Sequence, residues 1–323
     1  MERIPSKLVT VFGGSGFIGR YVVRELARHG WRVRVAVRRP DLVGHLQPMG
    51  MVGQIQPIQA NVRDKASVAH AVSHVDAVVN LVGILAEGGK QTFEAVQAEG
   101  AANIAEAAKA AGIGRMVHLS AIGADPNGTS NYARTKAKGE AAVLAAMPSA
   151  AIVRPSVVFG PEDSFFNRFA GIAKISPILP IVGGETRFQP IYAGDVGAFV
   201  AAAVDGQMDG GTIYELGGPD VKTFRALMEM MLEITRLKRK IVEIPFGLAA
   251  FQAKLMSILP NAPLTVDQVE LLKSDNVVSD AAAAEGRTLA AAGIVPHSLA
   301  VTLPTYLWTY RSGGQFAEPG SAS

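Results

Sequence analysis

The stretch that decides the fold is residues 8–19, Leu-Val-Thr-Val-Phe-Gly-Gly-Ser-Gly-Phe-Ile-Gly. Its first five residues suit a buried strand, and helical periodicity begins where the glycines end. Gly13, Gly16 and Gly19 have the spacing of a dinucleotide-binding turn: the first permits the turn, the second lets the backbone approach a pyrophosphate, and the third packs helix on strand. Phe17 and Ile18 open the helix, whose N–H groups would face the phosphates. The stretch therefore predicts a dinucleotide site.

The composition is that of a globular protein with a large core. The chain has 323 residues, 49% hydrophobic and 18% charged, which suits one α/β domain with an added lobe or two small domains. Cysteine is absent, and His70 and His74 lack a third ligand, so no disulfide and no metal site is predicted. Basic and aromatic residues are not interleaved, which argues against nucleic acid. The net charge of +3 is small, but the pI of about 9.1 permits attraction to anionic lipid or acidic partners. No apolar run approaches the roughly 20 residues that cross a bilayer, and we expect no signal or transit peptide before the first strand.

Strand and helix signals alternate along the chain after the glycine turn. Continuous apolar strands separated by helices indicate a parallel sheet covered on both faces. The expected strands are 32–38, 54–61, 77–82, 115–120 and 151–155, with helices such as 93–111 and 132–146 between them, and a last strand at 212–216 returns to the sheet. We predict an α/β fold with a Rossmann-type doubly wound parallel sheet in residues 1–217, a smaller, mostly helical C-terminal lobe in 218–312 and a flexible tail in 313–323.

Two arginines follow the second expected strand. Proteins that bind NAD usually have an acidic residue here for the ribose 2′-hydroxyl, whereas this chain reads Val37-Arg38-Arg39-Pro40. The guanidinium groups of Arg38 and Arg39 suit a 2′-phosphate, so the pattern favours NADPH over NADH. The alternative is a pair of solvated surface arginines.

The third and fourth strands end at the edge where open parallel sheets bind ligands. Asn61 and Val62 follow the third strand, and Asn61 can hydrogen-bond the edge of an adenine. The fourth strand runs through Asn80 to Val82, which is expected to line the cofactor. Asn80 suits either the crevice or a plain turn at the strand end.

Ser120, Tyr132 and Lys136 form a candidate proton-transfer site. Ser120 ends a strand and can hydrogen-bond a substrate carbonyl. Tyr132 and Lys136 are four residues apart at the start of a helix, so they share one face and the ammonium can lower the pKa of the phenol. The Y-x-x-x-K spacing alone is also found on exposed helix turns. Behind a strand-end serine and a dinucleotide turn, it predicts proton transfer beside a nicotinamide.

Together these residues resemble the short-chain dehydrogenase/reductase superfamily, in its extended, atypical branch. The resemblance makes the three glycines the cofactor turn and the serine, tyrosine and lysine the catalytic triad, of which Tyr132 and Lys136 also bind the cofactor. It adds Pro155 to the cofactor site, within the typical segment 154–161, Arg-Pro-Ser-Val-Val-Phe-Gly-Pro. Asn61 departs from the pattern, because an aspartate is common at that point.

A closer resemblance is to the nucleotide-binding accessory subunits of respiratory complex I, NADH:ubiquinone oxidoreductase. It is visible in 10–23, 132–140 and 159–167 and continues through 264–278 and 306–308. It implies a subunit that holds NADPH tightly and braces the quinone-module region beside other complex I subunits, without turnover. It also implies peripheral association with the inner or plasma membrane, on the matrix or cytoplasmic side. The intact triad keeps another function open, a free NADP(H)-dependent reductase, epimerase or dehydratase acting on a sugar nucleotide or another hydroxyl or carbonyl compound.

A second candidate surface lies in residues 245–259. This segment is apolar on most faces, is too short to span a membrane, and follows the basic run 236–240, Arg-Leu-Lys-Arg-Lys. A positive cluster beside an apolar helix suits anionic lipid headgroups or a membrane-embedded partner. The alternative is a core helix preceded by a solvated charged turn.

Overall fold

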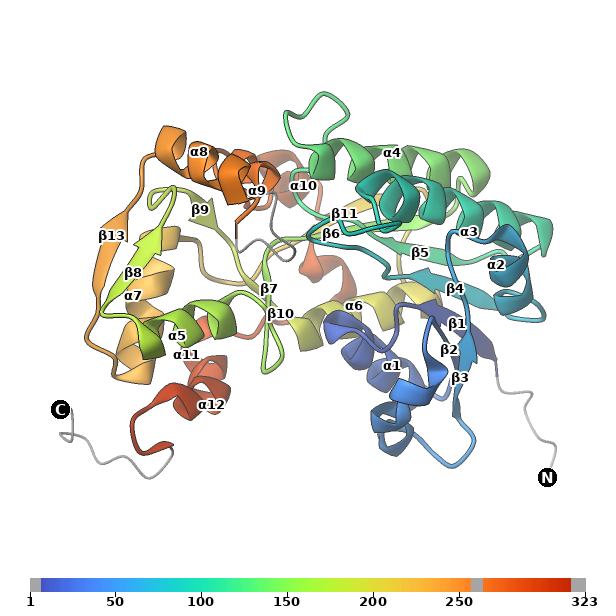
Figure 1. Cartoon of the computed structure of the whole chain (residues 1–323). Coiled ribbons are helices and arrows are strands. Elements are labelled where there is room, and N and C mark those ends of the chain that lie inside the picture. The colour runs from blue at the N-terminus through green and yellow to red at the C-terminus, as the bar shows by residue number, and fades with distance from the viewer. Residues whose placement is uncertain (1–6, 257–263, 315–323) are drawn as a thin grey trace. The chain divides into compact units, whose positions relative to one another are not determined.

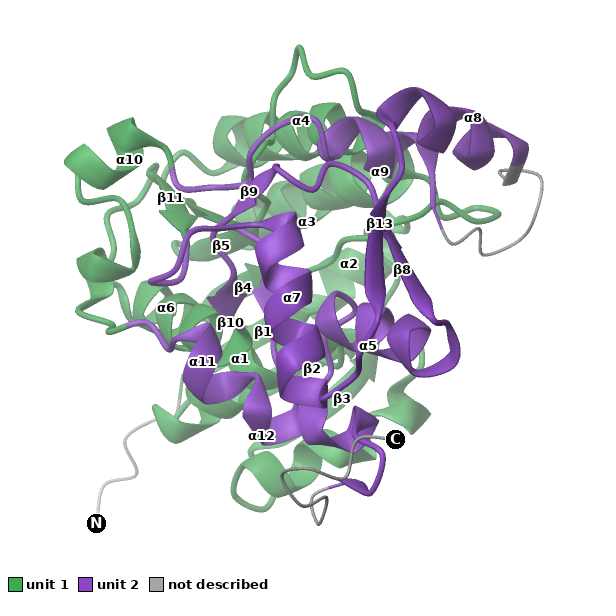
Figure 2. Ribbon diagram, turned by 90° about the vertical axis from the view of Figure 1, so that its left-hand side faces the viewer, with its two compact units in different colours: residues 1–155, 193–216, 279–295 green, residues 156–192, 217–278, 296–323 purple. Residues whose placement is uncertain are grey.

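Figure 1 shows the fold of the chain. The structure is a computed structural model, and it describes residues 7–256 and 264–314. The chain divides into two compact units, coloured separately in Figure 2. Unit 1 comprises 1–155, 193–216 and 279–295, and unit 2 comprises 156–192, 217–278 and 296–323. Among the described residues, no helix has both the length and the apolar character needed to cross a bilayer.

Unit 1 is built on a seven-stranded sheet in which all neighbouring strands are parallel. The strands are β1 (Leu8–Phe12), β2 (Arg32–Val37), β3 (Ile55–Gln59), β4 (Ala77–Asn80), β5 (Met116–Leu119), β6 (Ala151–Pro155) and β11 (Ile213–Leu216). Their order is β11-β6-β5-β4-β1-β2-β3, so the direction of winding reverses between β1 and β4. The predicted doubly wound sheet is confirmed, including the late strand that returns to its edge.

Helices cover both faces of this sheet (Figure 1). On one face α1 (Phe17–Arg28) packs against α6 (Ala193–Asp205), and on the other α2 (Lys65–Ala71), α3 (Glu99–Ala110) and α4 (Asn131–Ala146) pack side by side. A π-helical turn, η3 (Glu94–Ala98), precedes α3 and approaches α4 closely, because a Cβ at Gly139 would lie 2.3 Å from the carbonyl oxygen of Gln97. The shorter helices are η1 (Pro40–Leu42), η2 (Gly44–Met49), α10 (Asp280–Ala284) and η4 (Leu289–Ala292).

Unit 2 is smaller and mainly helical, as predicted for the C-terminal region, but its bounds differ from the predicted lobe, because it includes 156–192 and leaves 279–295 to unit 1. Its helices are α5 (Phe166–Ile175), α7 (Phe224–Thr235), α8 (Phe246–Met256), α9 (Val266–Leu271), α11 (Leu299–Thr302), α12 (Pro304–Leu307) and η5 (Trp308–Tyr310). Three two-stranded sheets pair β7 (Val158–Phe159) with β10 (Ile191–Tyr192), β9 (Arg187–Phe188) with β12 (Lys222–Thr223), and β8 (Ile178–Ile181) with β13 (Lys240–Glu243). The buried carboxylate of Asp163 accepts a hydrogen bond of 2.6 Å from the Tyr306 hydroxyl, which ties α12 to the segment before α5.

Candidate functional site

The glycine turn between β1 and α1 leaves no room for a side chain at Gly19 and favours glycine at Gly13. Gly13 has a φ of +78°, a conformation that favours glycine. A Cβ at Gly19 would lie 2.3 Å from the Gly13 oxygen and 2.6 Å from the carbonyl carbon of Gly14, so only glycine allows this approach of helix to strand. Gly16 is the N-cap of α1, and neither a side-chain cap nor an acidic residue occupies the first turn. The N–H groups that begin at Phe17 are therefore suited to an anion.

Arg38 and Arg39 are both exposed at the carboxyl end of β2, but they differ in their contacts. The Arg39 guanidinium donates to Asp41 at 3.1 Å from Nε and 2.8 Å from Nη2. This pairing raises the pKa of Arg39 and lowers the pKa of Asp41. The Arg38 side chain makes no hydrogen bond or ion pair with any residue in the described part of the chain. Arg38 is therefore the freer of the two guanidinium groups.

Asn61 and Val62 form the turn after β3. The Asn61 Oδ1 accepts a hydrogen bond of 3.2 Å from the backbone N–H of Arg63, and its own N–H donates to Ser67 Oγ at 3.0 Å. The Val62 carbonyl accepts from the side chain of Asn103 at 2.9 Å. Because Oδ1 is occupied, the amide NH2 is the part of Asn61 that suits a base, and it would donate to a ring nitrogen where an aspartate would accept.

The carboxyl ends of β4 and β6 place Val82 and Pro155. The backbone N–H of Val82 donates to Oδ1 of the buried Asn80 at 3.0 Å. The Asn80 amide nitrogen lies 3.0 Å from Nδ1 of His118 in β5. Pro155 ends β6, and its carbonyl accepts from the N–H of Ile122 at 3.0 Å. Asn80 is thus a linking residue between strands rather than a plain turn residue.

Ser120, Tyr132 and Lys136 gather at the carboxyl end of β5. Ser120 follows that strand directly, and its buried Oγ has no hydrogen-bond partner within residues 7–256 and 264–314. Tyr132 lies in the first turn of α4, half-buried, with its ring edge-on to Phe93 at 5.8 Å between centroids. The Lys136 Nζ donates to the Leu119 carbonyl at 3.2 Å and lies 5.9 Å from the centre of the Tyr132 ring. The arrangement suits proton transfer at a group bound beside the tyrosine.

The ammonium group of Lys136 is buried. Burial lowers its pKa from 10.5 to about 8, and the charge of Glu140, one helical turn later, opposes this shift. Glu140 itself pairs with Arg154 of β6 through contacts of 2.9 and 2.6 Å. Lys136 therefore loses its proton at a lower pH than an exposed lysine would.

His118 is the residue of this site that the sequence analysis missed. It is buried in β5 two residues before Ser120, and burial, followed by the charge of Lys136, lowers its pKa to about 3. Its Nε2 is buried without a partner among the residues that the structure describes, as are Ser120 Oγ and Gln97 Oε1. The available signal was a histidine within an otherwise apolar strand, because a buried imidazole needs hydrogen-bond partners.

The segment predicted as a membrane or partner contact forms α8 in unit 2, and its described part ends at Met256. Ala249 and Ala253 are buried against α9, whereas Leu248, Phe251 and Leu255 are 51%, 67% and 65% exposed. We call these three exposed residues the α8 stripe. Neither interpretation of the segment holds for the whole helix, since one face is core and the other is exposed.

Two other residues of that predicted contact surface do not join the stripe. Phe246 packs inward, because its ring would lie 2.9 Å from a Cβ at Gly183. Ile258 lies outside the described residues.

Most of β13 lies between the basic run 236–240 and the α8 stripe in the chain. The run ends at Lys240, the first residue of β13, and α8 begins at Phe246, after that strand. A strand rather than a turn connects the two parts, so the single combined basic and apolar surface stays a prediction.

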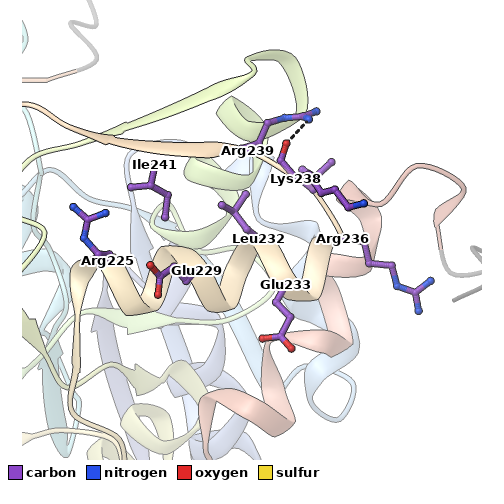
Figure 3. A pocket seen from close by; sticks show the side chains of 9 residues that line it. Arg225, Glu229, Leu232, Glu233, Arg236, Lys238, Arg239 and Ile241 are labelled. Carbon is purple, nitrogen blue, oxygen red and sulfur yellow. Dashed lines mark hydrogen bonds between the residues drawn. The ribbon is translucent and has the colours of Figure 1, made fainter. Parts of the chain in front are cut away.

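Residues of the basic run line an open depression of about 600 Å³ between α7 and β13 (Figure 3). Glu229 and Glu233 line it together with Arg236 and Arg239, so its charge is mixed. Arg239 is also tied to the backbone, since it donates to the Ala173 carbonyl at 2.6 Å. These features do not resemble a nucleotide site.

No group of three or more metal-binding side chains occurs in residues 7–256 and 264–314. His70 and His74 are both exposed, and α2 ends at Ala71, so the two imidazoles do not share a helix.

The doubly wound sheet, the glycine turn and the Ser-Tyr-Lys set define an NAD(P)-binding protein of the short-chain dehydrogenase/reductase type. The chain belongs to the NAD dependent epimerase/dehydratase family, whose model matches residues 9–217. The fold is shared with NADPH-dependent quinone oxidoreductase QOR2 of Escherichia coli, solved with NADPH, at a TM-score of 0.72 and 18% identity over 93% of this chain and 99% of that one. At this identity the likeness concerns the fold alone.

Three relatives are similar over most of the chain. Subunit 9 of the NADH dehydrogenase [ubiquinone] 1 alpha subcomplex from Arabidopsis thaliana is 37% identical over 95% of this chain and 79% of its own length. The 40 kDa subunit of NADH-ubiquinone oxidoreductase from Neurospora crassa is 31% identical over 96% and 81%. A ceramide reductase of Caulobacter vibrioides is 30% identical over 86% and 88%.

Proposed function

We propose that this chain is an accessory subunit of respiratory complex I that holds NADPH and stabilises or assembles the junction of the quinone module with the membrane arm. The observation that carries the proposal is the 37% identity with the plant subunit over 95% of this chain, since a match of that extent includes unit 2 as well as the nucleotide-binding unit. The nucleotide acts here as a structural ligand, because a ligand that binds only the folded state stabilises it by mass action.

The nucleotide preference rests on the arginines after β2. We assign the 2′-phosphate contact to Arg38, because Arg39 is already held by Asp41. Protein as purified is expected to release mainly NADPH on denaturation. Charged hydrogen bonds contribute about 1.5–3 kcal/mol, so Arg38→Ala should weaken NADPH binding roughly 10- to 100-fold. Arg39→Ala is the matched control and should have a smaller effect.

Titration of both nucleotides tests this assignment. NADH lacks the 2′-phosphate, so its affinity should be the same in the wild type and in Arg38→Ala. A wild type that releases mainly NAD(H), or an Arg38→Ala variant that loses both nucleotides equally, would contradict the preference for NADPH.

We assign the contact with other complex I subunits, at the membrane surface, to the α8 stripe. The α8 stripe exposes three large apolar side chains on one helix face to water, which is unfavourable in free energy. Association with a partner would bury them. Each would contribute about 1.5–3 kcal/mol when buried against an apolar partner. Peripheral attachment through such a surface needs no membrane-spanning helix.

The combined change Phe251→Gln and Leu255→Gln is expected to release the protein from complex I and from membranes. Wild-type protein should migrate with complex I in native gels, and the variant should remain soluble with its NADPH bound, because the nucleotide-site residues belong to unit 1. Val301→Gln is the control, since Val301 is 69% exposed in the same unit. Wild-type protein that never accompanies complex I would overturn the proposed function.

A second candidate function is that of a free reductase for a carbonyl compound. It is favoured by the complete set Ser120, Tyr132 and Lys136 and by the relative named ceramide reductase. Bound NADPH would supply a hydride to the carbonyl carbon. Ser120 would hold the carbonyl oxygen, and Tyr132 would give its proton to that oxygen as the alcohol forms.

Tyr132→Phe separates the two candidates, because it removes the phenol proton and keeps the ring against Phe93. A structural subunit should keep its NADPH, its place in complex I and normal quinone reduction with this change. Loss of cellular function with nucleotide content intact would favour the reductase.

A further inference from the structure

The three residues after β4 connect the glycine turn to Lys136. We call Leu81–Gly83 the strand-end bend. A Cβ at Gly13 would lie 3.3 Å from the carbonyl carbon of Leu81 and 3.4 Å from Cγ2 of Val82. At the other end of the bend, a Cβ at Gly83 would lie 3.3 Å from Nζ of Lys136. A shift of the bend would therefore disturb both parts of the nucleotide site.

The side chain of Asn80 holds the strand-end bend through a hydrogen bond. Asn80 is 1% exposed, and its Oδ1 accepts from the backbone N–H of Val82 at 3.0 Å. A backbone N–H can only donate, so this contact fixes the orientation of the Asn80 amide. The amide nitrogen must then face His118 Nδ1, which lies 3.0 Å away.

The orientation of Asn80 determines the tautomer of His118. Since the amide nitrogen donates, Nδ1 of His118 accepts, and the ring proton is on Nε2. His118 stays neutral across the physiological range because burial, together with the charge of Lys136, lowers its pKa to about 3. A protonated imidazole would present a donor to the donating amide and break the arrangement.

We propose that His118 is a positioning residue for the nucleotide site, which acts by fixing the Asn80 amide and through it the strand-end bend. The inference rests on the nucleotide binding proposed above. In this proposal, the contact that positions the Asn80 amide is the hydrogen bond accepted by Nδ1 of the imidazole. The competing possibility is a contact made by Nε2–H, which has no hydrogen-bond partner in the described part of the chain.

Two substitutions distinguish the ring nitrogens. His118→Asn places an amide oxygen near the position of Nδ1 and can still accept from Asn80, whereas His118→Gln places its amide near Nε2 and leaves Asn80 without an acceptor. Wild type and both variants are stripped of nucleotide and titrated with NADPH. Their unfolding in urea without nucleotide is measured in parallel.

We expect His118→Asn to bind NADPH within about threefold of the wild type and His118→Gln to bind at least about tenfold more weakly. His118→Gln should unfold at a lower urea concentration than His118→Asn, because it leaves the buried Asn80 amide unpaired. Both variants should still be fully folded where NADPH is titrated, which separates positioning from general stability. Asn80→Ala should weaken binding to a similar extent. His118→Gln should add little in that background, because the two residues act as one unit.

The opposite ranking, with His118→Gln binding well and His118→Asn weakly, would overturn the proposal in favour of Nε2–H. Wild-type affinity in both variants, or losses that simply follow their unfolding, would also overturn it. A wild type that binds no nucleotide would overturn the proposed function and this inference together.

Discussion

Gly19→Ala is expected to destabilise unit 1 by about 3 kcal/mol or more and to empty the nucleotide site. The added methyl would meet the Gly13 oxygen at 2.3 Å and the Gly14 carbonyl carbon at 2.6 Å, both backbone atoms that side-chain rotation cannot move. Relief requires α1 to move away from β1, which opens the turn that would hold the pyrophosphate. Urea unfolding and chromatography of released nucleotide measure the two effects.

Gly16 supplies the matched controls for this prediction. A Cβ there would lie 3.3 Å from the Gly13 oxygen, a tight contact that a shift of a few tenths of an ångström relieves, so Gly16→Ala should destabilise the protein far less than Gly19→Ala. Gly16→Val should exclude the nucleotide because its side chain fills the space of the pyrophosphate. Its free energy of unfolding should fall by the stabilisation that bound nucleotide provides, about 2.7 kcal/mol at a free nucleotide concentration of 100 times the Kd. A Gly19→Ala protein with wild-type stability and bound nucleotide would contradict the geometry of this turn.

Most of unit 1 was predictable because its signals are local. The strand, glycine turn and helix at 8–28 are adjacent in the chain, and continuous apolar strands between helices indicate a parallel sheet whatever their order. Placing the predicted site residues needed one further rule, that parallel strands present their carboxyl ends at one edge. The return of 279–295 to unit 1 has no such local signal.

The contacts that organise the site could not be predicted because they join distant residues. Asn80 and His118 are 38 positions apart, and their hydrogen bond depends on the register of β4 with β5. The same limit applies to the basic run and the α8 stripe. The two segments are close together in the sequence, but the strand between them, β13, forms through its pairing with β8, which the sequence does not show.

Lys136 has one feature that the sequence predicts and one that it does not. Its four-residue spacing from Tyr132 can be seen in the sequence, whereas its burial cannot. The four-residue spacing predicts a shared helix face for an ammonium and a phenol. Only the fold shows that Nζ ends at the Leu119 carbonyl with its side chain enclosed. Burial makes this lysine a source of instability in the absence of ligand, which leads to a measurable dependence on pH.

Lys136→Met is expected to stabilise the nucleotide-free protein at neutral pH while weakening NADPH binding. The pKa of Lys136 is lowered from 10.5 to about 8 on folding, which corresponds to roughly 3 kcal/mol of penalty for the charged form. Between these pH values the unfolded chain binds the proton and the folded chain does not, so wild-type stability should rise with pH there and be lost as pH falls through about 8. Met keeps most of the apolar stem and has no charge, so the variant should lack this rise.

Urea unfolding of nucleotide-free wild type and variant from neutral pH to about pH 9.5 measures the difference in slope. Lys138→Met is the control, because Lys138 lies two residues along the same helix, is exposed, and pairs with Glu94 at the surface. It should keep the wild-type rise with pH. If Lys136→Met instead shows the same slope as the wild type, the ammonium is solvated in the folded protein. If it is strongly destabilised at pH 7, the contact of Nζ with Leu119 outweighs the cost of burying the charge.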